Sequence, residues 1–206
     1  MLSKIYFDFD EIDDKTRKKL VQGSVIPRPI AWVTSRNEDG SINLAPFSYF
    51  NMIANNVVGI SFQNTSQHYK HSYENIKRSK EAIIHIPDLS LLSAMDDSAK
   101  VLAKNDSEID LINLQVENAK KVDVPLLKDA KIAMEVNYLD EVVIKDDENP
   151  ENQANLLILK VVAIHVDASV LDIENNYIIA DKLIPVARLG GPNYASIKTL
   201  NYQRKY

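Results

Sequence analysis

A series of apolar stretches rich in β-branched residues constrains the fold of this chain more than any other feature. They are Ile30 to Thr34, Ile53 to Phe62, Ala82 to Pro87, Ile132 to Leu139, Leu156 to Val166 and Tyr177 to Ile184. Because β-branched residues favour strands, several of these stretches are predicted to be strands. Helical patterns interrupt them without regular alternation, at Asp10 to Gly23, Ser72 to Ser79 and Leu89 to Ala103. This order favours a mainly antiparallel β domain decorated with helices, and a barrel, because closure removes sheet edges.

Residues 1–206 are predicted to form a single domain. The stretch Leu156 to Val166 is apolar on both alternating faces, which is typical of a strand in the interior or at an interface. Lys145 to Asn155 is the only stretch with the composition of a linker, but it lies between two predicted strands. It is therefore interpreted as an exposed hairpin loop and not as a domain boundary.

Charge and hydropathy exclude several classes of partner. The net charge of -5 supplies no basic field for nucleic acid or an anionic membrane. No apolar run reaches the roughly 18 to 20 residues of a membrane span, and the start of the chain has no signal-peptide pattern, so a cytoplasmic protein is expected. The absence of cysteine excludes disulfides, thiolate nucleophiles and cysteine-ligated metals.

Glycine is too scarce for the usual nucleotide-binding turns. The 5 glycines allow neither a G-x-G-x-x-G turn nor a phosphate loop ending in G-K-S/T. A bound phosphate would have to contact side chains and ordinary amides, and the candidate cluster is Asn64 to Ser72. Its suitable donors are Thr65, Ser66, Lys70 and Ser72. Alternatively Ser72 only caps the helix that follows and Lys70 is solvated; the spacing alone favours this second interpretation.

Histidine and serine patterns give no catalytic or metal signature. His85 and His165 lie on predicted strands, and His68 and His71 lie in a polar loop. None belongs to a recognised metal motif, so no metal site is expected, and structural roles are the better interpretation. The chain also lacks the G-x-S-x-G turn of many serine hydrolases.

The segment Pro27 to Asn51 combines a hairpin with a candidate ligand edge. Its Asp39-Gly40 pair is a strong hairpin signal. Pro46 removes a donor, so the backbone from Ala45 to Ser48 is predicted to be free to bond a flat heterocycle. The side chains expected beside it are the polar Asn43, Ser48 and Asn51 and the aromatic Trp32, Phe47, Tyr49 and Phe50. The aromatic residues would alternatively fill the barrel core.

Taken in order, these motifs resemble one family. "PRPIAWVTS", an Asp-Gly turn, "NLAPFSYFN", "ISF", a Lys-x-Ser followed by "NI", "VPLL" and "PVARLGGPNYA" are similar to the flavin reductase-like family, from about Gly23 to Ala195. The resemblance implies a Greek-key split β-barrel that binds FMN near the interface of a homodimer. It also implies hydride transfer from NADH or NADPH to the flavin N5 and onward transfer to an electron acceptor.

The resemblance also implies the site residues. Those expected along the flavin are Asn43, Ala45, Pro46, Phe47, Ser48, Asn51 and Ser61. Lys70 and Ser72 would bind the phosphate, and Arg28 and Arg188 would lie on the cofactor side or at the interface. Family members resemble Lys-Asp-Thr where this chain has Lys70-His71-Ser72, so His71 replaces an acid. No catalytic side chain is named, because the cofactor carries the chemistry.

Two alternatives to an NAD(P)H:flavin oxidoreductase stay open. One is an electron carrier that holds FMN tightly and is reduced by a protein partner. The other is a flavin-binding protein without turnover. Neither the nicotinamide preference nor the acceptor has a signature, and substrate selectivity is assigned only to loops such as Asp88 to Asn105.

Overall fold

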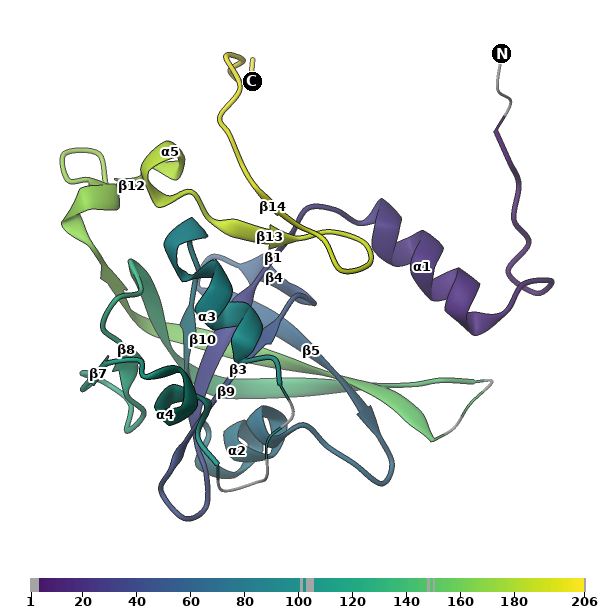
Figure 1. Cartoon of the computed structure of the whole chain (residues 1–206), viewed down its shortest axis with the longest axis horizontal. Helices are drawn as coiled ribbons and strands as arrows, with labels where there is room; N and C mark the ends of the chain where they lie inside the picture. The colour runs from purple at the N-terminus through teal and green to yellow at the C-terminus, as the bar shows by residue number, and fades with distance from the viewer. Residues whose placement is uncertain (1–3, 101, 103–105, 148, 150, 206) are drawn as a thin grey trace.

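Seven strands of the computed structural model, which describes residues 4–100, 102, 106–147, 149 and 151–205, form one antiparallel sheet (Figure 1). Its order is β3-β2-β6-β9-β10-β5-β4. The strands are β2 (Ala31–Arg36), β3 (Ile42–Phe47), β4 (Phe50–Ala54), β5 (Val57–Thr65), β6 (Glu81–His85), β9 (Ile132–Lys145) and β10 (Asn152–Val166). The edge strands β3 and β4 follow one another in the chain, separated only by Ser48 and Tyr49.

The sheet curls around a core, which makes it a split β-barrel. Phe47 on β3 and Phe62 on β5 have ring centroids 4.6 Å apart, although four strands separate β3 from β5 in the sheet. One buried cluster joins residues of β2, β5, β6, β9, β10 and the helix α2 (His71–Ser79). Such contacts require the two edges to approach each other, and this brings the β3–β4 connection beside β5.

A second core lies on the outer face of β2, because successive side chains of a strand point to opposite faces. Ala31 and Val33 belong to the inner cluster, whereas Trp32 packs with Leu44, Met95 and other residues outside the barrel. This outer cluster lies under α3 (Leu92–Asp97) and α4 (Glu108–Ile112). Trp32 is therefore a core residue and not the wall of a site.

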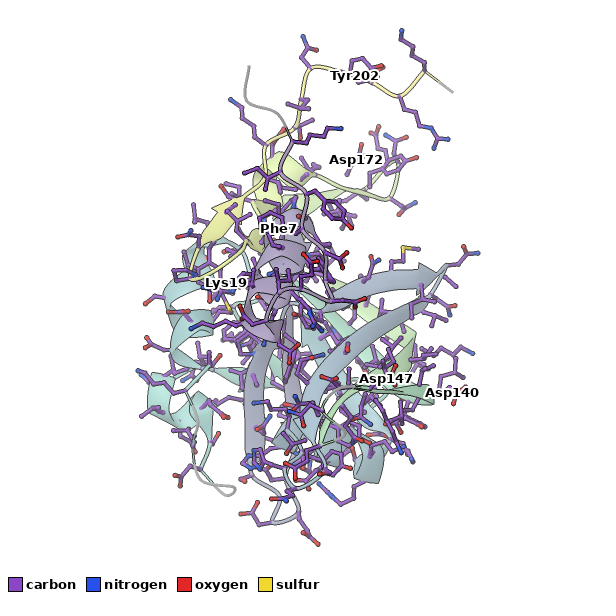
Figure 2. The ribbon with its side chains drawn as sticks, turned by 90° about the vertical axis from the view of Figure 1, so that its right-hand side faces the viewer. Phe7, Lys19, Asp140, Asp147, Asp172 and Tyr202 are labelled. Atoms are coloured by element: carbon purple, nitrogen blue, oxygen red, sulfur yellow. The ribbon has the colours of Figure 1, made fainter. Side chains whose placement is uncertain are left out.

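The remaining elements are short. They are α1 (Asp14–Ser24), β1 (Arg28–Pro29), η1 (Leu89–Leu91), β7 (Val116–Glu117), β8 (Leu126–Leu127), η2 (Ala168–Val170), β11 (Leu171–Asp172), β12 (Tyr177–Ile178), α5 (Ala180–Leu183), β13 (Val186–Arg188) and β14 (Tyr194–Ser196). β1, β13 and β14 form a separate three-stranded sheet. Figure 1 shows α1 to one side of the barrel and α2 at its lower end. Figure 2 shows Lys19 on α1 and Phe7 on the preceding segment, in front of the barrel.

Most of the predicted elements are confirmed. The Asp-Gly turn joins β2 to β3, with Gly40 at a φ of 91° that favours glycine. The predicted helix at Ser72 to Ser79 is α2. In the predicted hairpin loop Lys145 to Asn155, Lys145 ends β9 and Asn152 to Asn155 already belong to β10, which pairs with β9. β10 lies inside the sheet between β9 and β5, as its apolar pattern indicated. None of the described helices is long and apolar enough to cross a membrane.

Several predictions were wrong in part. Ile53 to Phe62 is two strands, because a turn at Asn55 and Asn56 separates β4 from β5. Tyr177 to Ile184 forms only the short β12 and then α5. The helix expected from Asp10 begins at Asp14, because the Asp13 side chain accepts from the Thr16 N–H at 3.0 Å as its N-cap. The helix expected over Leu89 to Ala103 is η1 and α3, which ends at Asp97; Ala103 lies outside the described residues.

His85 has a structural role, as expected from its place on a strand. Its side chain is fully buried, with Nδ1 at 2.9 Å from the Trp32 carbonyl and Nε2 accepting from the Leu127 N–H at 2.9 Å. These partners assign the neutral ring with the proton on Nδ1. Burial lowers the pKa of His85 to about 4.

Candidate functional site

The candidate site is a cavity of about 420 Å³ at the open side of the barrel. This volume is in the range of small-molecule and cofactor sites, about 300 to 1,000 Å³. Its walls come from β3 and the β3–β4 connection, β5, the start of α2, one face of α1 and the segment that follows α3. Elements far apart in the sequence therefore meet around one space.

The structure brings most of the predicted site residues together. Those that line the cavity are Asn43, Ala45, Pro46, Phe47, Ser48, Ser61, Lys70 and Ser72. Tyr49, expected as an aromatic wall, also lines it, whereas Phe50 packs against the barrel core. Thr65 and Ser66, expected as phosphate donors, do not line it.

The predicted residues Arg28, Asn51 and Arg188 lie outside the lining of the cavity. Arg28 donates to the carbonyls of Gln22 at 2.6 Å, Val25 at 2.7 Å and Leu189 at 2.9 Å, so it fixes the end of α1. The exposed Asn51 accepts a bond from the Met52 N–H. Arg188 lies over the ring of Tyr194, with 4.6 Å to its centroid. The cofactor role of these residues stays a prediction.

The start of α2 faces the cavity without a capping side chain. The N-cap residue is Lys70, and no side chain of the described residues caps the helix. The first backbone N–H groups of a helix have no partner within it, so this end is suited to bind an anion. The alternative in which Ser72 caps the helix is wrong, because Ser72 is the second residue of α2.

Ser72 is held from β3. The Asn43 side-chain amide donates to Ser72 Oγ at 2.7 Å and to Ser35 Oγ at 3.4 Å. Asn43 and Ser72 are both buried, at 4% and 1% exposed. Asn75 on α2 also donates to Ser35 Oγ, at 3.1 Å. These bonds attach α2 to the β2–β3 hairpin and fix the position of the Ser72 hydroxyl at the cavity.

Cations outnumber acids around the cavity. Lys18, Lys70 and Lys100 line it, and Glu108 is the only carboxylate among the described residues that do. Lys100 pairs with Asp97 at 2.8 Å, whereas Lys18 and Lys70 have no ion pair within the described part of the chain. In a chain of net charge -5, such a local excess of positive charge favours an anionic ligand.

Glu108 bonds to the backbone of β3. Its Oε2 accepts from the Leu44 N–H at 2.8 Å, and the neighbouring Ser107 Oγ donates to the Ile42 carbonyl at 2.7 Å. Burial raises the pKa of Glu108, more than the Leu44 bond lowers it. The Glu108 carboxyl thus occupies part of the outer edge of β3 at the cavity.

The outer edge of β3 offers few remaining polar groups. Backbone groups of a strand alternate in direction, so Ile42, Leu44 and Pro46 face away from β2. β3 pairs with β2 as far as Phe47, opposite Ala31, so the expectation of a poorly paired hairpin end was wrong. The free backbone groups that this hairpin offers to the cavity are therefore confined to the outer edge of β3 after Leu44 and to the β3–β4 connection.

Aromatic and helical side chains complete the walls. Tyr49 OH accepts from Gln22 Nε2 of α1 at 2.6 Å, which joins α1 to the β3–β4 connection. Phe47 packs on Phe62 beneath the cavity. Apolar walls together with an excess of cations among the lining residues fit a flat heterocycle that carries a phosphate, the chemical form of FMN.

Some lining residues had no sequence signal. Lys18 and Gln22 lie on α1, which buries none of its residues, so no apolar pattern aligned this helix with the barrel. Ser98, Ala99, Lys100, Leu102 and Glu108 come from the segment after α3 and from α4. Part of this segment lies in the region expected to govern selectivity, but its residues follow no motif. Gln63 and His68 were not predicted to be site residues either.

Comparisons with known proteins identify relatives of this chain. The model of the flavin reductase like domain matches residues 23–179. An uncharacterized protein of Bacillus subtilis is 34% identical over 193 residues, which cover 93% of this chain and 94% of that protein.

Two solved structures are similar over almost the whole chain. Nitrilotriacetate monooxygenase component B from Bacillus cereus has 33% identity and a TM-score of 0.92, covering 98% of this chain and 100% of that one. The 2-nitrobenzoate 2-nitroreductase of Pseudomonas fluorescens has 25% identity and a TM-score of 0.84, covering 98% of each chain. Fold and sequence therefore point to the same family.

Proposed function

This chain belongs to the flavin reductase-like family, and from that membership we propose that it is an NAD(P)H-dependent oxidoreductase that binds FMN in the cavity. When bound, FMN supplies a ring that accepts a hydride and passes the electrons on. The chain's own task is to hold that cofactor, to leave space for a nicotinamide and to exclude competing reactions.

The phosphate of FMN is proposed to bind at the start of α2. Lys70 supplies a positive charge, Ser72 a hydroxyl, and the first amides of the helix supply donors without intrahelical partners. Charge-assisted bonds of this kind contribute about 1.5 to 3 kcal/mol each. His68 and His71 also line the cavity. Because His71 stands where family members resemble an acid, this chain has no carboxylate between Lys70 and Ser72.

The flavin ring is proposed to lie along the segment from Ala45 to Ser48. The outer edge of β3 ends there, and Phe47, Ser61 and Tyr49 provide the adjoining surfaces. Glu108 and Ser107 already occupy the polar groups of Leu44 and Ile42, so ring contacts are confined to the end of the strand. No side chain is assigned as an acid or base for hydride transfer.

The acceptor is proposed from the solved neighbours. The Bacillus cereus protein is a component of a monooxygenase, and by analogy this chain would deliver reduced flavin to an oxygenase partner. The nitroreductase neighbour raises a second possibility, the reduction of a nitroaromatic compound at the bound flavin.

A homodimer is proposed from the outer face of the sheet. Exposed apolar side chains lie on β4, β9 and β10, in the half of the sheet ordered β9-β10-β5-β4. Val142 is 46% exposed and lies opposite Leu156, and Ile53 is 50% exposed beside Gly59 and Leu156. Large exposed apolar patches mark interaction sites, and a second copy of the chain would cover this one.

The observation that carries the proposal is that predicted flavin contacts from β3, β5 and α2 line one cavity with excess positive charge. The test is oxidation of NADH and of NADPH, followed at 340 nm with the purified protein and added FMN. Turnover that depends on both protein and FMN supports the reductase. Tightly held flavin that no nicotinamide reduces would favour the electron carrier, and absence of flavin binding would reject both.

A further inference from the structure

A relay of buried side-chain amides connects the start of α2 to strands on the barrel wall. The Lys70 backbone N–H donates to Asn64 Oδ1 at 2.9 Å, and Asn64 Nδ2 donates to Asn155 Oδ1 at 2.9 Å. Asn155 Nδ2 in turn donates to Glu141 Oε1 at 2.6 Å. Asn64 and Asn155 are only 5% and 2% exposed. The relay thus joins β5, β10 and β9 to the N-cap of the helix.

The relay returns to α2 at its other end. Lys77 Nζ lies 2.5 Å from Glu141 Oε2, and the Tyr73 hydroxyl donates to Glu141 Oε1 at 2.8 Å. Burial opposes the ionisation of Glu141, but the bonds from Lys77, Tyr73 and Asn155 outweigh it and lower the pKa of Glu141. A charged Glu141 can only accept, so Asn155 must donate to it.

The negative charge of Glu141 therefore fixes which group donates and which accepts in every hydrogen bond of the relay. Because Asn155 donates its amide to Glu141, only its oxygen is left to accept from Asn64. Asn64 consequently turns its own oxygen toward the Lys70 N–H. The bond from the Lys70 N–H to Asn64 matters because the side chain of Lys70, the N-cap residue, does not cap the helix. The preceding loop gives little packing support, since Ser66 to His68 are exposed.

We propose that Asn64 is a positioning residue that holds the uncapped start of α2 in the geometry needed to bind a phosphate monoester. Asn155 and Glu141 act through it by fixing the orientation of its amide. The inference rests on the proposed function, which places the phosphate of FMN at Lys70 and Ser72. Asn64 itself does not line the cavity, so its effect is transmitted through the backbone of Lys70.

The test compares the affinities for FMN and for riboflavin, which lacks the phosphate. Their ratio isolates the phosphate contribution, whereas a general loss of structure weakens both ligands. The variant is Asn64→Ala, and the matched control is Asn37→Ala. Asn37 is another buried asparagine, 2% exposed, that also holds α2, because it accepts from Asn75 in the second turn of the helix, but it makes no bond to Lys70 or Asn64.

For the wild type we expect FMN to bind at least about tenfold more tightly than riboflavin, as one charge-assisted bond allows. In Asn64→Ala the ratio of the affinity for FMN to the affinity for riboflavin should fall by about tenfold. In Asn37→Ala this ratio should stay at the wild-type value. A wild type without any preference for FMN rejects the proposed phosphate site and this inference with it. A preference that Asn64→Ala retains overturns the inference alone and leaves the proposed function standing.

A charge exchange within the relay keeps the proposal testable if Asn64→Ala does not fold. Asn155→Asp alone places two carboxylates side by side and should reduce the preference for FMN. The double variant Asn155→Asp/Glu141→Gln moves the negative charge by one link: position 141 now donates to position 155, which still accepts from Asn64. We expect it to recover most of the preference. Failure to recover in a protein whose stability is restored would contradict a positioning role.

Discussion

The side-chain amide of Asn43 donates a 2.7 Å hydrogen bond to the hydroxyl of Ser72, and both residues are buried. This bond joins an edge strand of the barrel to the second residue of α2. Asn43 was predicted as a direct flavin contact, and it lines the cavity. Its amide hydrogen bonds, however, go to Ser72 and Ser35, so part of its role is to place the Ser72 hydroxyl.

Asn43→Ala should therefore lower the free energy of unfolding by about 1 to 3 kcal/mol, because it leaves the buried Ser72 hydroxyl without its donor. Urea unfolding measures the loss. Combined with Ser72→Ala in a double-mutant cycle, the two changes should be coupled by at least about 0.5 kcal/mol. Strictly additive effects would show that the bond contributes nothing to stability.

Glu108 should make stability depend on pH. Burial raises its pKa in the folded state above the ordinary value of 4.5, so the folded state holds the proton more firmly than the unfolded state. Stability from this group is greatest at low pH and falls as the pH rises above about 4.5. Glu108→Gln keeps an acceptor for the Leu44 N–H but does not titrate.

Urea unfolding at pH 5 and pH 8 gives the free energy of unfolding of Glu108→Gln minus that of wild type. We therefore expect this difference to be more favourable to the variant at pH 8 than at pH 5. Glu108→Ala is the control, because it also removes the acceptor. It should be less stable than Glu108→Gln at either pH. An equal difference between Glu108→Gln and wild type at the two pH values would contradict the raised pKa.

His85 should act in the opposite direction. Its folded pKa of about 4 lies below the ordinary value of 6.5, so the unfolded state binds the proton first as the pH falls. Stability from this group is complete above pH 6.5 and decreases toward pH 4, by about 2 to 3 kcal/mol. His85→Gln removes the titration, so the advantage of wild type over this variant should shrink by that amount between pH 7 and pH 4.5. An unchanged advantage would mean that His85 is not held neutral.

Val142→Lys tests the proposed dimer. The side chain is 46% exposed in the single chain, so a lysine there should leave the fold intact, which circular dichroism can verify. Sedimentation should give the wild type about twice the chain mass of 23.3 kDa, and the variant should dissociate. A monomeric wild type would refute the homodimer.

The sequence predicted the site best where its residues are neighbours in the chain. Asn43 to Ser48 and Lys70 to Ser72 lie on two short segments, and the Asp-Gly turn and the strand patterns placed both beside the barrel. Lys18 and Glu108 were missed because they reach the cavity only through packing of distant segments. α1 buries no side chain, so it has no apolar face that could have indicated its partner.

The errors in the predicted strands also arise where the structure depends on packing between segments. The stretch Ile53 to Phe62 is interrupted by polar residues only at Asn55, Asn56 and Ser61, and the turn at the two asparagines depends on β5 folding back onto β4. Pro46 suggested a broken ladder, but its missing N–H belongs on the outer edge of β3, where none of the described strands pairs. Local composition does not specify which edge of a strand will be hydrogen-bonded to a neighbouring strand.

The most direct test of the central claim is the binding of FMN to the purified, dialysed protein, measured from flavin absorbance and fluorescence. We expect one FMN per chain, and Lys70→Met should weaken FMN binding by about tenfold or more while leaving riboflavin nearly unaffected. Lys182→Met, an exposed lysine outside the cavity, is the control. A colourless protein that fails to bind added FMN, or a Lys70→Met variant that binds FMN as tightly as wild type, would contradict this assignment of the cavity.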